Sequence, residues 1–296
     1  MKTKTIFEGA ATALITPFKN GAIDFESFGK LIDTQIAAGI DALVVAGTTG
    51  EGSTLTDEEH RACIDFAVKQ VAGRVPVIAG TGSNDTAYAV ELSRYACAAG
   101  ADALLVISPY YNKATQKGLI ANFTAIADAS DKPIILYNVP SRTGCNILPA
   151  TCAALAEHPR IVAIKEACGD LSQIAETARL VAGKMDIYSG NDDQVLPVLS
   201  LGGRGVISVL SNVLPAKTQA MVDRWFAGDI AGSTAMQLEM LPLVHALFSE
   251  VNPIPVKAAM SAMGYGENYL RLPLTPMEDA NAEKLYALMR EQSLID

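Results

Sequence analysis

A lysine at the end of an apolar segment offers a reactive amine. Residues 161–166 read Ile-Val-Ala-Ile-Lys-Glu, which is the composition of a buried β-strand that ends near Lys165. Alternation along a strand predicts two faces, with Ile161, Ala163 and Lys165 on one and Val162 and Ile164 on the other. An amine withdrawn from water disfavours its ammonium form, and a neutral amine adds to carbonyl compounds. Lys165 is therefore a candidate for Schiff-base catalysis, although an exposed lysine beside Glu166 is the commoner case.

Hydroxyl groups follow a second apolar segment. The turn at residues 47–51 reads Gly-Thr-Thr-Gly-Glu and comes directly after the segment 42–46. Its backbone N–H groups, together with the hydroxyls of Thr48 and Thr49, could bind a carboxylate. Alternatively, its two glycines only supply the positive φ of a tight turn. A phosphate-binding loop is not favoured, because no Gly-Lys-Ser or Gly-Lys-Thr follows.

Aromatic and basic side chains follow further segments of this kind. Tyr110 and Tyr111 come after one of them, Tyr137 ends another, and Arg142 lies a few residues beyond Tyr137. By alternation Tyr137 faces the same interior as Lys165, where its hydroxyl could transfer protons. A core tyrosine bonded to a backbone group is the alternative. Arg142 could bind a carboxylate through two hydrogen bonds, or it is a solvated loop arginine.

Two other polar groups have simpler interpretations. Asp192 and Asp193 could suggest a metal site, but capping of the following helix explains them more cheaply. Residues 56–59 form a capping box, and His60 is expected on the exposed surface of the helix that this box begins. The three histidines have no metal-ligand spacing, so the sequence predicts no metal site.

Eight short apolar segments alternate with helical patterns along the chain. They are residues 10–16, 42–46, 75–79, 103–107, 134–138, 161–166, 186–189 and 205–209. Strands that alternate with helices form parallel sheets, and eight of them close a barrel. The sequence therefore predicts an α/β fold, a (β/α)8 TIM barrel at residues 1–228 with a C-terminal three-helix extension at residues 229–296. An open doubly wound sheet is weaker, since no Gly-x-Gly-x-x-Gly follows the first segment.

The barrel changes how the candidate residues are interpreted. In this fold the carboxyl ends of the strands, and the loops after them, form the site. The polar groups expected to converge are therefore Thr48, Thr49, Tyr110, Tyr111, Tyr137, Arg142 and Lys165. A lysine surrounded by hydroxyls and an arginine suits carbonyl chemistry, which makes catalysis the favoured role of Lys165.

Composition disfavours some classes of binding partner and indicates the cellular compartment. The 296 residues carry a net charge of −9, which argues against nucleic acid or an anionic membrane as a partner. No segment reaches the length of a membrane span. The five cysteines are odd in number and form no Cys-x-x-Cys pair. This usage is typical of reduced thiols in a cytoplasmic protein.

Four motifs together resemble those of the pyruvate-dependent class I aldolase superfamily and, within it, of the dihydrodipicolinate synthase family. They are residues 47–51, residues 108–112 (Ser-Pro-Tyr-Tyr-Asn), residues 137–144 (Tyr-Asn-Val-Pro-Ser-Arg-Thr-Gly) and residues 164–166 (Ile-Lys-Glu). The resemblance runs from about residue 9 to the C-terminus. Arg142 is the most discriminating residue, because sialic acid lyases of the superfamily lack the Ser-Arg-Thr-Gly form of this loop.

The resemblance implies roles for the residues around the lysine. Lys165 would form an imine with pyruvate, and Thr48 and Thr49 would hold the pyruvate carboxylate. Tyr137, Thr48 and, across a subunit boundary, Tyr111 would relay protons. The resulting enamine would then attack an aldehyde.

The second substrate and the assembly are also implied by the resemblance. The aldehyde would be that of L-aspartate 4-semialdehyde, with Arg142 binding its carboxylate, and Gly190 and Ile207 would shape the pyruvate pocket. The product would enter diaminopimelate and lysine synthesis. No metal or organic cofactor is implied, and the expected assembly is a homotetramer built as a dimer of dimers.

A regulatory site is expected in a degenerate form. Family members inhibited by lysine bind it at a subunit interface, and the corresponding positions here are Ser53, Asp57, His60, Asn84, Tyr88 and Tyr110. The strongly inhibited pattern resembles two histidines and a glutamate. Here Asp57 replaces one histidine and Tyr88 replaces the glutamate. Because a carboxylate partner for the lysine α-amine is then missing, we expect weak or absent inhibition by lysine.

Two other functions stay open at the level of sequence. One is a different pyruvate-dependent aldolase that acts on a sugar acid or a hydroxy-oxo acid, and the aldehyde it accepts would separate it. The other is a barrel without catalysis, retained as a sensor or structural protein. Formation of a reducible imine with pyruvate would exclude this last alternative.

Overall fold

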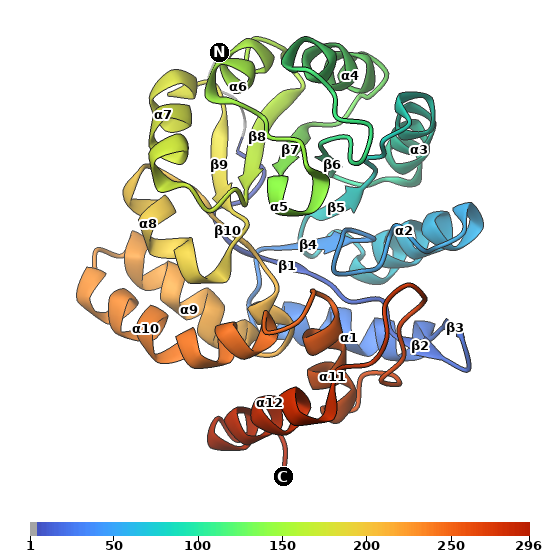
Figure 1. Ribbon diagram of the computed structural model, residues 1–296, viewed down its shortest axis with the longest axis vertical. Coiled ribbons are helices and arrows are strands. Elements are labelled where there is room, and N and C mark those ends of the chain that lie inside the picture. The colour runs from blue at the N-terminus through green and yellow to red at the C-terminus, as the bar shows by residue number, and fades with distance from the viewer. Residues whose placement is uncertain (1–4) are drawn as a thin grey trace.

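The predicted barrel is confirmed in a computed structural model that describes residues 5–296. Within these residues eight parallel strands close a barrel in the order β1-β10-β9-β8-β7-β6-β5-β4, and helices surround it (Figure 1). The barrel strands are β1 (Gly9–Ala13), β4 (Ala42–Val45), β5 (Val77–Gly80), β6 (Ala103–Ile107), β7 (Ile134–Asn138), β8 (Ile161–Glu166), β9 (Asp186–Ser189) and β10 (Gly205–Ser208). The predicted domain starts at residue 1, and residues 1–4 lie outside the described part.

Helices connect the strands and form the outer layer. They are α1 (Phe25–Ala37), α2 (Asp57–Val71), α3 (Thr86–Ala99), α4 (Gln116–Asp128), α5 (Pro140–Thr143), α6 (Pro149–Leu155), α7 (Leu171–Val181), α8 (Val195–Ser200) and α9 (Pro215–Phe226). The expected three C-terminal helices follow as α10 (Ile230–Leu247), α11 (Ile254–Ala262) and α12 (Asp279–Glu291). Two 3-10 turns, η1 (Asp192–Gln194) and η2 (Leu210–Asn212), precede α8 and α9. The division of the chain at residue 228 stays a prediction.

Local sequence signals start several of these helices. The capping box before α2 is present as predicted, because the Thr56 hydroxyl accepts from Glu59 N and the Glu59 carboxylate accepts from Thr56 N. Asp24, Asp85 and Asp170 cap α1, α3 and α7 with carboxylates that accept from backbone N–H groups of the first turn. Each cap satisfies N–H groups that a helix start otherwise leaves unpaired.

Two local features differ from the sequence-based expectation. The first strand ends at Ala13 because, beyond it, Ile15 N donates to Asn212 Oδ1 over 3.1 Å instead of to a neighbouring strand. A small hairpin of β2 (Phe18–Lys19) and β3 (Ala22–Ile23) then precedes α1. These differences reflect tertiary partners that have no local signal.

The strand that carries Lys165 also departs from the predicted alternation. Ile161 and Ile164 pack in the cluster between strands and helices, whereas Val162 and Ala163 pack in the barrel interior. The predicted faces for Ile161 and Val162 are therefore wrong. The cause is a register shift in the pairing of β7 with β8, where Ile134 pairs with Ile161 but the next residue pairs with Ala163.

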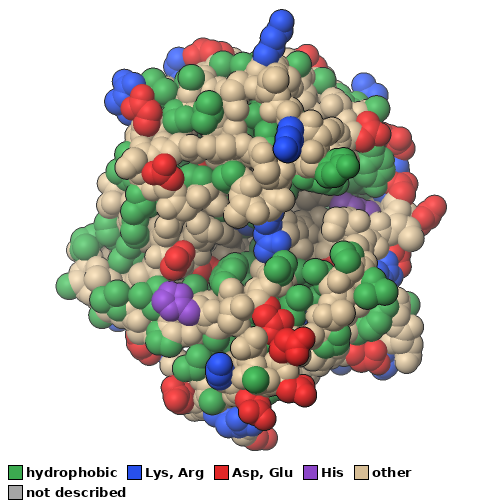
Figure 2. Space-filling model, viewed as in Figure 1, with side chains coloured by type: hydrophobic (Ala, Val, Ile, Leu, Met, Phe, Trp, Pro, Cys, Tyr) green, Lys and Arg blue, Asp and Glu red, His purple; other side chains and the backbone are tan. Residues whose placement is uncertain are grey.

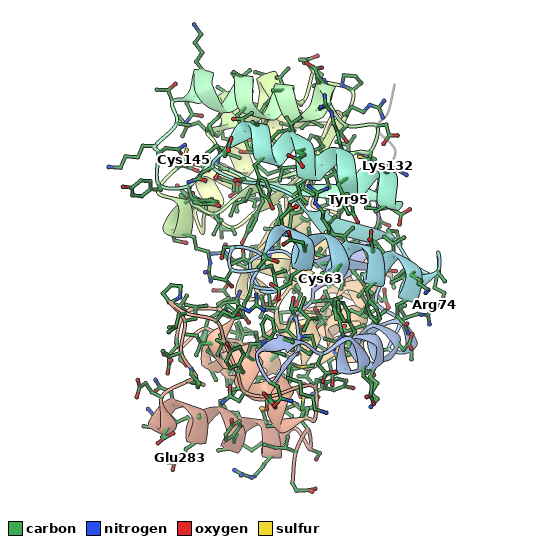
Figure 3. All side chains as sticks on the ribbon, turned by 90° about the vertical axis from the view of Figure 1, so that its right-hand side faces the viewer. Cys63, Arg74, Tyr95, Lys132, Cys145 and Glu283 are labelled. Carbon is green, nitrogen blue, oxygen red and sulfur yellow. The ribbon has the colours of Figure 1, made fainter. Side chains whose placement is uncertain are left out.

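The C-terminal helices lie against one side of the barrel (Figure 1). Helix α10 packs on α9, and α12 packs on α10 and α11. Figure 3 shows Glu283, on α12, near the lower end of the molecule and Cys63, on α2, near its middle, where Cys63 is fully buried. This arrangement brings the chain between α10 and α11 back to the barrel.

All five cysteines are free thiols, with Cys63, Cys145 and Cys152 buried. No helix among residues 5–296 combines the length and the hydropathy that crossing a bilayer requires.

Candidate active site

Lys165 lies near the carboxyl end of β8, buried inside the barrel. It is 5% exposed, so the alternative of a solvent-exposed lysine is wrong. Its Nζ lies 4.4 Å from the centroid of the Tyr137 ring, and Tyr137 is its register partner on β7. Tyr137 packs in the barrel interior, as predicted. The two side chains therefore face one another in a site that is largely closed to water.

Gly190, directly after β9, leaves the space that Lys165 occupies. A β-carbon at this position would lie 3.0 Å from Lys165 Cε and 2.8 Å from Ala167 Cβ, closer than side chains tolerate. Gly190 N also donates to Glu166 O over 2.7 Å. The absence of a side chain here therefore avoids a clash with Ala167 and a tight contact with the buried lysine. Ile207, on β10, contributes an apolar side chain to the same interior.

The turn after β4 carries the two threonines, and Thr49 is buried. The turn is closed by hydrogen bonds from Glu51 N to Thr48 O and from Gly52 N to Gly47 O, each 3.1 Å long. Positive φ occurs at Glu51 (54°) and not at the glycines of the turn. Gly50 is instead needed for close approach, since a β-carbon there would lie 3.1 Å from Leu14 O. The alternative that these glycines only supply positive φ is therefore wrong.

A cavity of about 370 Å³ opens beside Thr48 and Tyr137, which are two of the four catalytic candidates. Arg142 and Tyr110 also line it. Figure 2 shows this face of the molecule hollowed near its centre, with basic side chains in blue at the hollow. Arg142 is carried by the short helix α5, where the sequence suggested a loop. The cavity can therefore bring an anionic ligand close to hydroxyls and a guanidinium.

Tyr111 does not join this group within one chain. Its side chain is 88% exposed, and its backbone has a φ of 73°. That conformation is uncommon for a bulky residue. Tyr111 N donates to Thr143 O over 3.3 Å, which fixes the backbone while the ring stands away from the surface.

The residues expected to form the regulatory site lie along the same cavity and behind it. Ser53, His60, Tyr88 and Tyr110 line the cavity, whereas Asp57 and Asn84 do not. Tyr88 Oη donates to Asp57 Oδ1 over 3.1 Å, and Arg61 Nε donates to Asp57 Oδ2 over 2.7 Å. Burial, together with this bond to Asp57, raises the pKa of Tyr88 to about 12. The Tyr88 hydroxyl and the Asp57 carboxylate are therefore each other's hydrogen-bond partners.

His60 is buried, so the expectation of an exposed position on α2 is wrong. It is 6% exposed, and its Nε2 lies 2.7 Å from Gly80 O at the end of β5. Burial lowers the pKa of His60, and the bond to this carbonyl acts in the opposite direction. The ring joins α2 to the barrel at the wall of the cavity.

Two buried carboxylates lie close to Lys165, and the sequence did not single out their roles. Glu166 accepts from Asn138 Nδ2 (3.0 and 3.2 Å) and from Cys168 N (2.9 Å). Asp192 Oδ2 accepts from the backbone N–H groups of residues 209 and 210, at 3.0 and 2.9 Å. Burial raises the pKa of both carboxyls, and for Asp192 the charge of Lys165 opposes the rise.

Asp192 is therefore not a helix cap, and that prediction is wrong. It is the first residue of η1, where no side chain caps the turn, and it fixes the backbone after β10 instead. A buried aspartate beside a strand end is the signal that could have found it, but burial is not visible in a single sequence. Among residues 5–296 no group of three or more metal-ligating side chains is placed to hold a metal ion.

Comparison with known proteins identifies the family. A profile described as the dihydrodipicolinate synthetase family matches residues 6–292. A 4-hydroxy-tetrahydrodipicolinate synthase of Lachnoclostridium phytofermentans is 57% identical, over 98% of this chain and 99% of that relative. A second enzyme of that name, from Thermoanaerobacter sp. (strain X514), is 55% identical over 98% of both chains.

Solved structures agree with this result. The dihydrodipicolinate synthase of Acinetobacter baumannii, solved in complex with pyruvate, has a TM-score of 0.96 at 41% identity, covering 98% of this chain and 100% of that one. A dihydrodipicolinate synthase variant described as monomeric also has a TM-score of 0.96, at 42% identity over 98% of both chains.

The likeness extends over nearly the whole chain, barrel and C-terminal helices included. It shows 4-hydroxy-tetrahydrodipicolinate synthase activity, which is a lyase activity of lysine biosynthesis, as the four motifs predicted. It favours this activity over a sugar-acid aldolase and over a barrel without catalysis. The chain belongs to the dihydrodipicolinate synthetase family.

Proposed function

We propose that Lys165 carries the reaction by forming an imine with pyruvate. The observation that supports this most is the burial of its amine inside the barrel, 4.4 Å from the Tyr137 ring. The amine adds to the pyruvate C2 carbonyl, and water leaves as the C=N bond forms. Thr48 and Thr49, in the turn after β4, would hold the pyruvate carboxylate by donating hydroxyl hydrogen bonds.

The imine then becomes a carbon nucleophile. A base removes a proton from the pyruvate methyl group, and the enamine that forms attacks the aldehyde of L-aspartate 4-semialdehyde. Tyr137, Thr48 and the Tyr111 of a neighbouring subunit would relay the protons. The amine of the second substrate finally attacks the imine carbon, which closes the ring and returns Lys165 as a free amine.

Arg142 is proposed to select the second substrate. It lies on α5 at the cavity wall, where a guanidinium can bind the semialdehyde carboxylate. Gly190 and Ile207 would shape the pyruvate pocket, because both lie in or beside the interior that contains Lys165.

Pyruvate consumption tests these roles. We expect consumption to require the semialdehyde in the wild type, and we expect Arg142→Ala to weaken the use of the semialdehyde by about 100-fold, the effect of a lost bidentate pair. Arg142→Lys is the matched control, which keeps the charge but loses the fork geometry. Reduction by borohydride in the presence of pyruvate alone should label Lys165. Labelling of another lysine would overturn the imine assignment.

We also propose a homotetramer, a dimer of dimers, in the cytoplasm. The exposed ring of Tyr111 supports an interface on the face that carries it. The five free thiols support a reducing compartment. Sedimentation at several protein concentrations tests the assembly, and a stable monomer would contradict it.

Lysine is proposed to inhibit this enzyme weakly or not at all. Asp57 is engaged by Tyr88 and Arg61, so it offers no free carboxylate to the α-amine of a bound lysine. Activity measured across a lysine titration should stay near its starting value up to about 1 mM, a usual limit of enzyme affinities. Strong inhibition at submillimolar lysine would contradict the proposal. Tyr88→Glu, with Asp57→His, is expected to increase the sensitivity.

A further inference from the structure

Asn252, between α10 and α11, contacts both groups that are proposed to bind substrate carboxylates. Its Nδ2 donates to Thr49 Oγ1 over 3.1 Å, and its backbone carbonyl accepts from Arg142 Nη2 over 3.0 Å. The residue is 5% exposed, and among residues 5–296 its Oδ1 has no hydrogen-bond partner. A residue from the C-terminal region thus joins two loops of the barrel mouth.

The segment that carries Asn252 is held by an ion pair below the same turn. Lys257, on α11, is 1% exposed, and its Nζ donates to Thr16 O over 2.6 Å. The same Nζ lies 3.0 Å from Glu51 Oε1, and Glu51 ends the turn that contains Thr49. Its ammonium also lies 4.2 Å from the centroid of the Phe18 ring. The positions of Asn252 and of Thr49 are therefore fixed relative to each other at two points.

The direction of the first hydrogen bond matters for the chemistry. A threonine hydroxyl has one proton to donate and two lone pairs that accept. Because Asn252 Nδ2 donates to Thr49 Oγ1, the bond uses a lone pair and leaves the hydroxyl proton free. That proton is the one a carboxylate needs, and a hydroxyl that already accepts a hydrogen bond becomes a stronger donor.

We propose that Asn252 is a positioning residue of this site. Its side-chain amide aims the Thr49 hydroxyl at the carboxylate of the first substrate, and its backbone carbonyl orients Arg142 toward the carboxylate of the second. The proposal rests on the roles given above to Thr49 and Arg142. The C-terminal region then contributes a residue to the active site, because the barrel alone would lack the contacts that Asn252 makes with Thr49 and Arg142.

The side chain and the backbone make separable predictions. Asn252→Ala removes the amide but keeps the carbonyl that Arg142 contacts. We therefore expect kcat/KM for pyruvate to fall about tenfold, the effect of one hydrogen bond, while kcat/KM for the semialdehyde changes by less than about twofold. The pyruvate concentration that gives half-maximal labelling by borohydride should rise in parallel. This second readout needs no aldehyde.

A second variant of Asn252 and a control at another asparagine distinguish a loss of positioning from a general loss of stability. Asn252→Asp keeps the shape but offers no donor, and its carboxylate repels that of pyruvate, so its loss should exceed that of Asn252→Ala. Asn122→Ala is the matched control, since Asn122 on α4 is also buried and bonded to a threonine, Thr86. It should leave both kcat/KM values unchanged. Melting temperatures identify any variant that does not fold.

A double-mutant cycle decides the mechanism. If Asn252 acts through the Thr49 hydroxyl, then Thr49→Val combined with Asn252→Ala should weaken pyruvate binding no more than Thr49→Val alone. Additive losses, or an Asn252→Ala variant indistinguishable from Asn122→Ala, overturn this inference alone. A Thr49→Val variant with normal pyruvate binding overturns the role of Thr49 as well, so the two failures are distinguishable.

Discussion

At the scale of single residues, the site depends on one position that has no side chain. A β-carbon at Gly190 would lie 2.8 Å from Ala167 Cβ and 3.0 Å from Lys165 Cε, so a side chain there would force one of these groups to shift. The glycine also anchors the end of β9 by donating to Glu166 O. Gly190 therefore has two roles: it leaves space beside Lys165, and it pairs the end of β9 with β8.

Gly190→Ala is expected to lower kcat by about 10- to 100-fold, because it displaces the reactive amine from its productive position. The measurement is the steady-state rate, together with the yield of the imine trapped by borohydride. Gly118→Ala is the matched control. It lies in α4, where an added β-carbon would lie 3.4 Å from Thr115 Oγ1, so it should keep full activity. Equal rates for Gly190→Ala and the wild type would contradict the steric role.

At the scale of elements, buried polar residues join helices to the strands that they cover. His60 joins α2 to the end of β5, and Lys257 joins α11 to the turn after β4. Neither contact forms between residues near one another in sequence. Substituting either residue therefore tests how a helix is attached to the barrel, rather than how the helix itself forms.

The contact of His60 makes stability depend on pH. Burial lowers the pKa of His60 below its ordinary value of 6.5, although Asp57 raises it and Arg61 lowers it further. Below about pH 6.5 the unfolded chain binds a proton that the folded chain rejects, so stability is lost as the pH falls. His60→Gln should reduce this loss of stability between about pH 7.5 and pH 5.

Denaturant unfolding at each pH measures that difference, at a fixed protein concentration. His245→Gln, on α10, controls for the removal of a histidine elsewhere in the chain. An unchanged pH slope in His60→Gln would show that other groups cause the acid sensitivity.

Lys257→Met should destabilise the fold by about 3 kcal/mol, because it leaves the Glu51 carboxylate buried without its partner. The midpoint of denaturant unfolding reports this change. Lys30→Met is the matched control, since Lys30 pairs with Glu26 on the exposed surface and should matter little. If Lys257→Met were as stable as the Lys30 variant, the ion pair would not hold α11 in place.

At the scale of the whole molecule, the proposed role of Tyr111 depends on the assembly. Tyr111 is 88% exposed, so in the single chain its ring lies outside the closed interior that contains Lys165. If it acts in a neighbouring subunit, then two inactive variants should complement one another. Tyr111→Phe lacks the hydroxyl, and Lys165→Met lacks the amine.

Equal amounts of these two variants, unfolded together and refolded, should recover about one quarter of wild-type activity. Half of the randomly paired dimers are then hybrids, and one site of each hybrid has both groups. Each variant refolded alone serves as the baseline. No recovery, with hybrid formation shown by native mass measurement, would place the Tyr111 function within its own subunit.

The sequence by itself determined the features that depend on neighbouring residues. Apolar segments alternating with helical patterns predicted eight strands and the barrel, and Thr56 with Glu59 predicted the start of α2. The motifs around Lys165, Tyr137 and Arg142 predicted the family. Such signals are local, because hydrogen bonding within a helix and alternation along a strand act over a few residues.

The tertiary structure alone decided which distant groups meet. The register shift in β8 placed Val162 inside the barrel, and packing of α2 on β5 placed His60 at the cavity wall instead of on the surface. Asp192 accepts from the backbone that follows β10 instead of capping its own helix. Asn252 reached Thr49 across 203 residues of chain. These contacts depend on how the packed elements fit together, and packing is a property of the whole fold that no short stretch of sequence encodes.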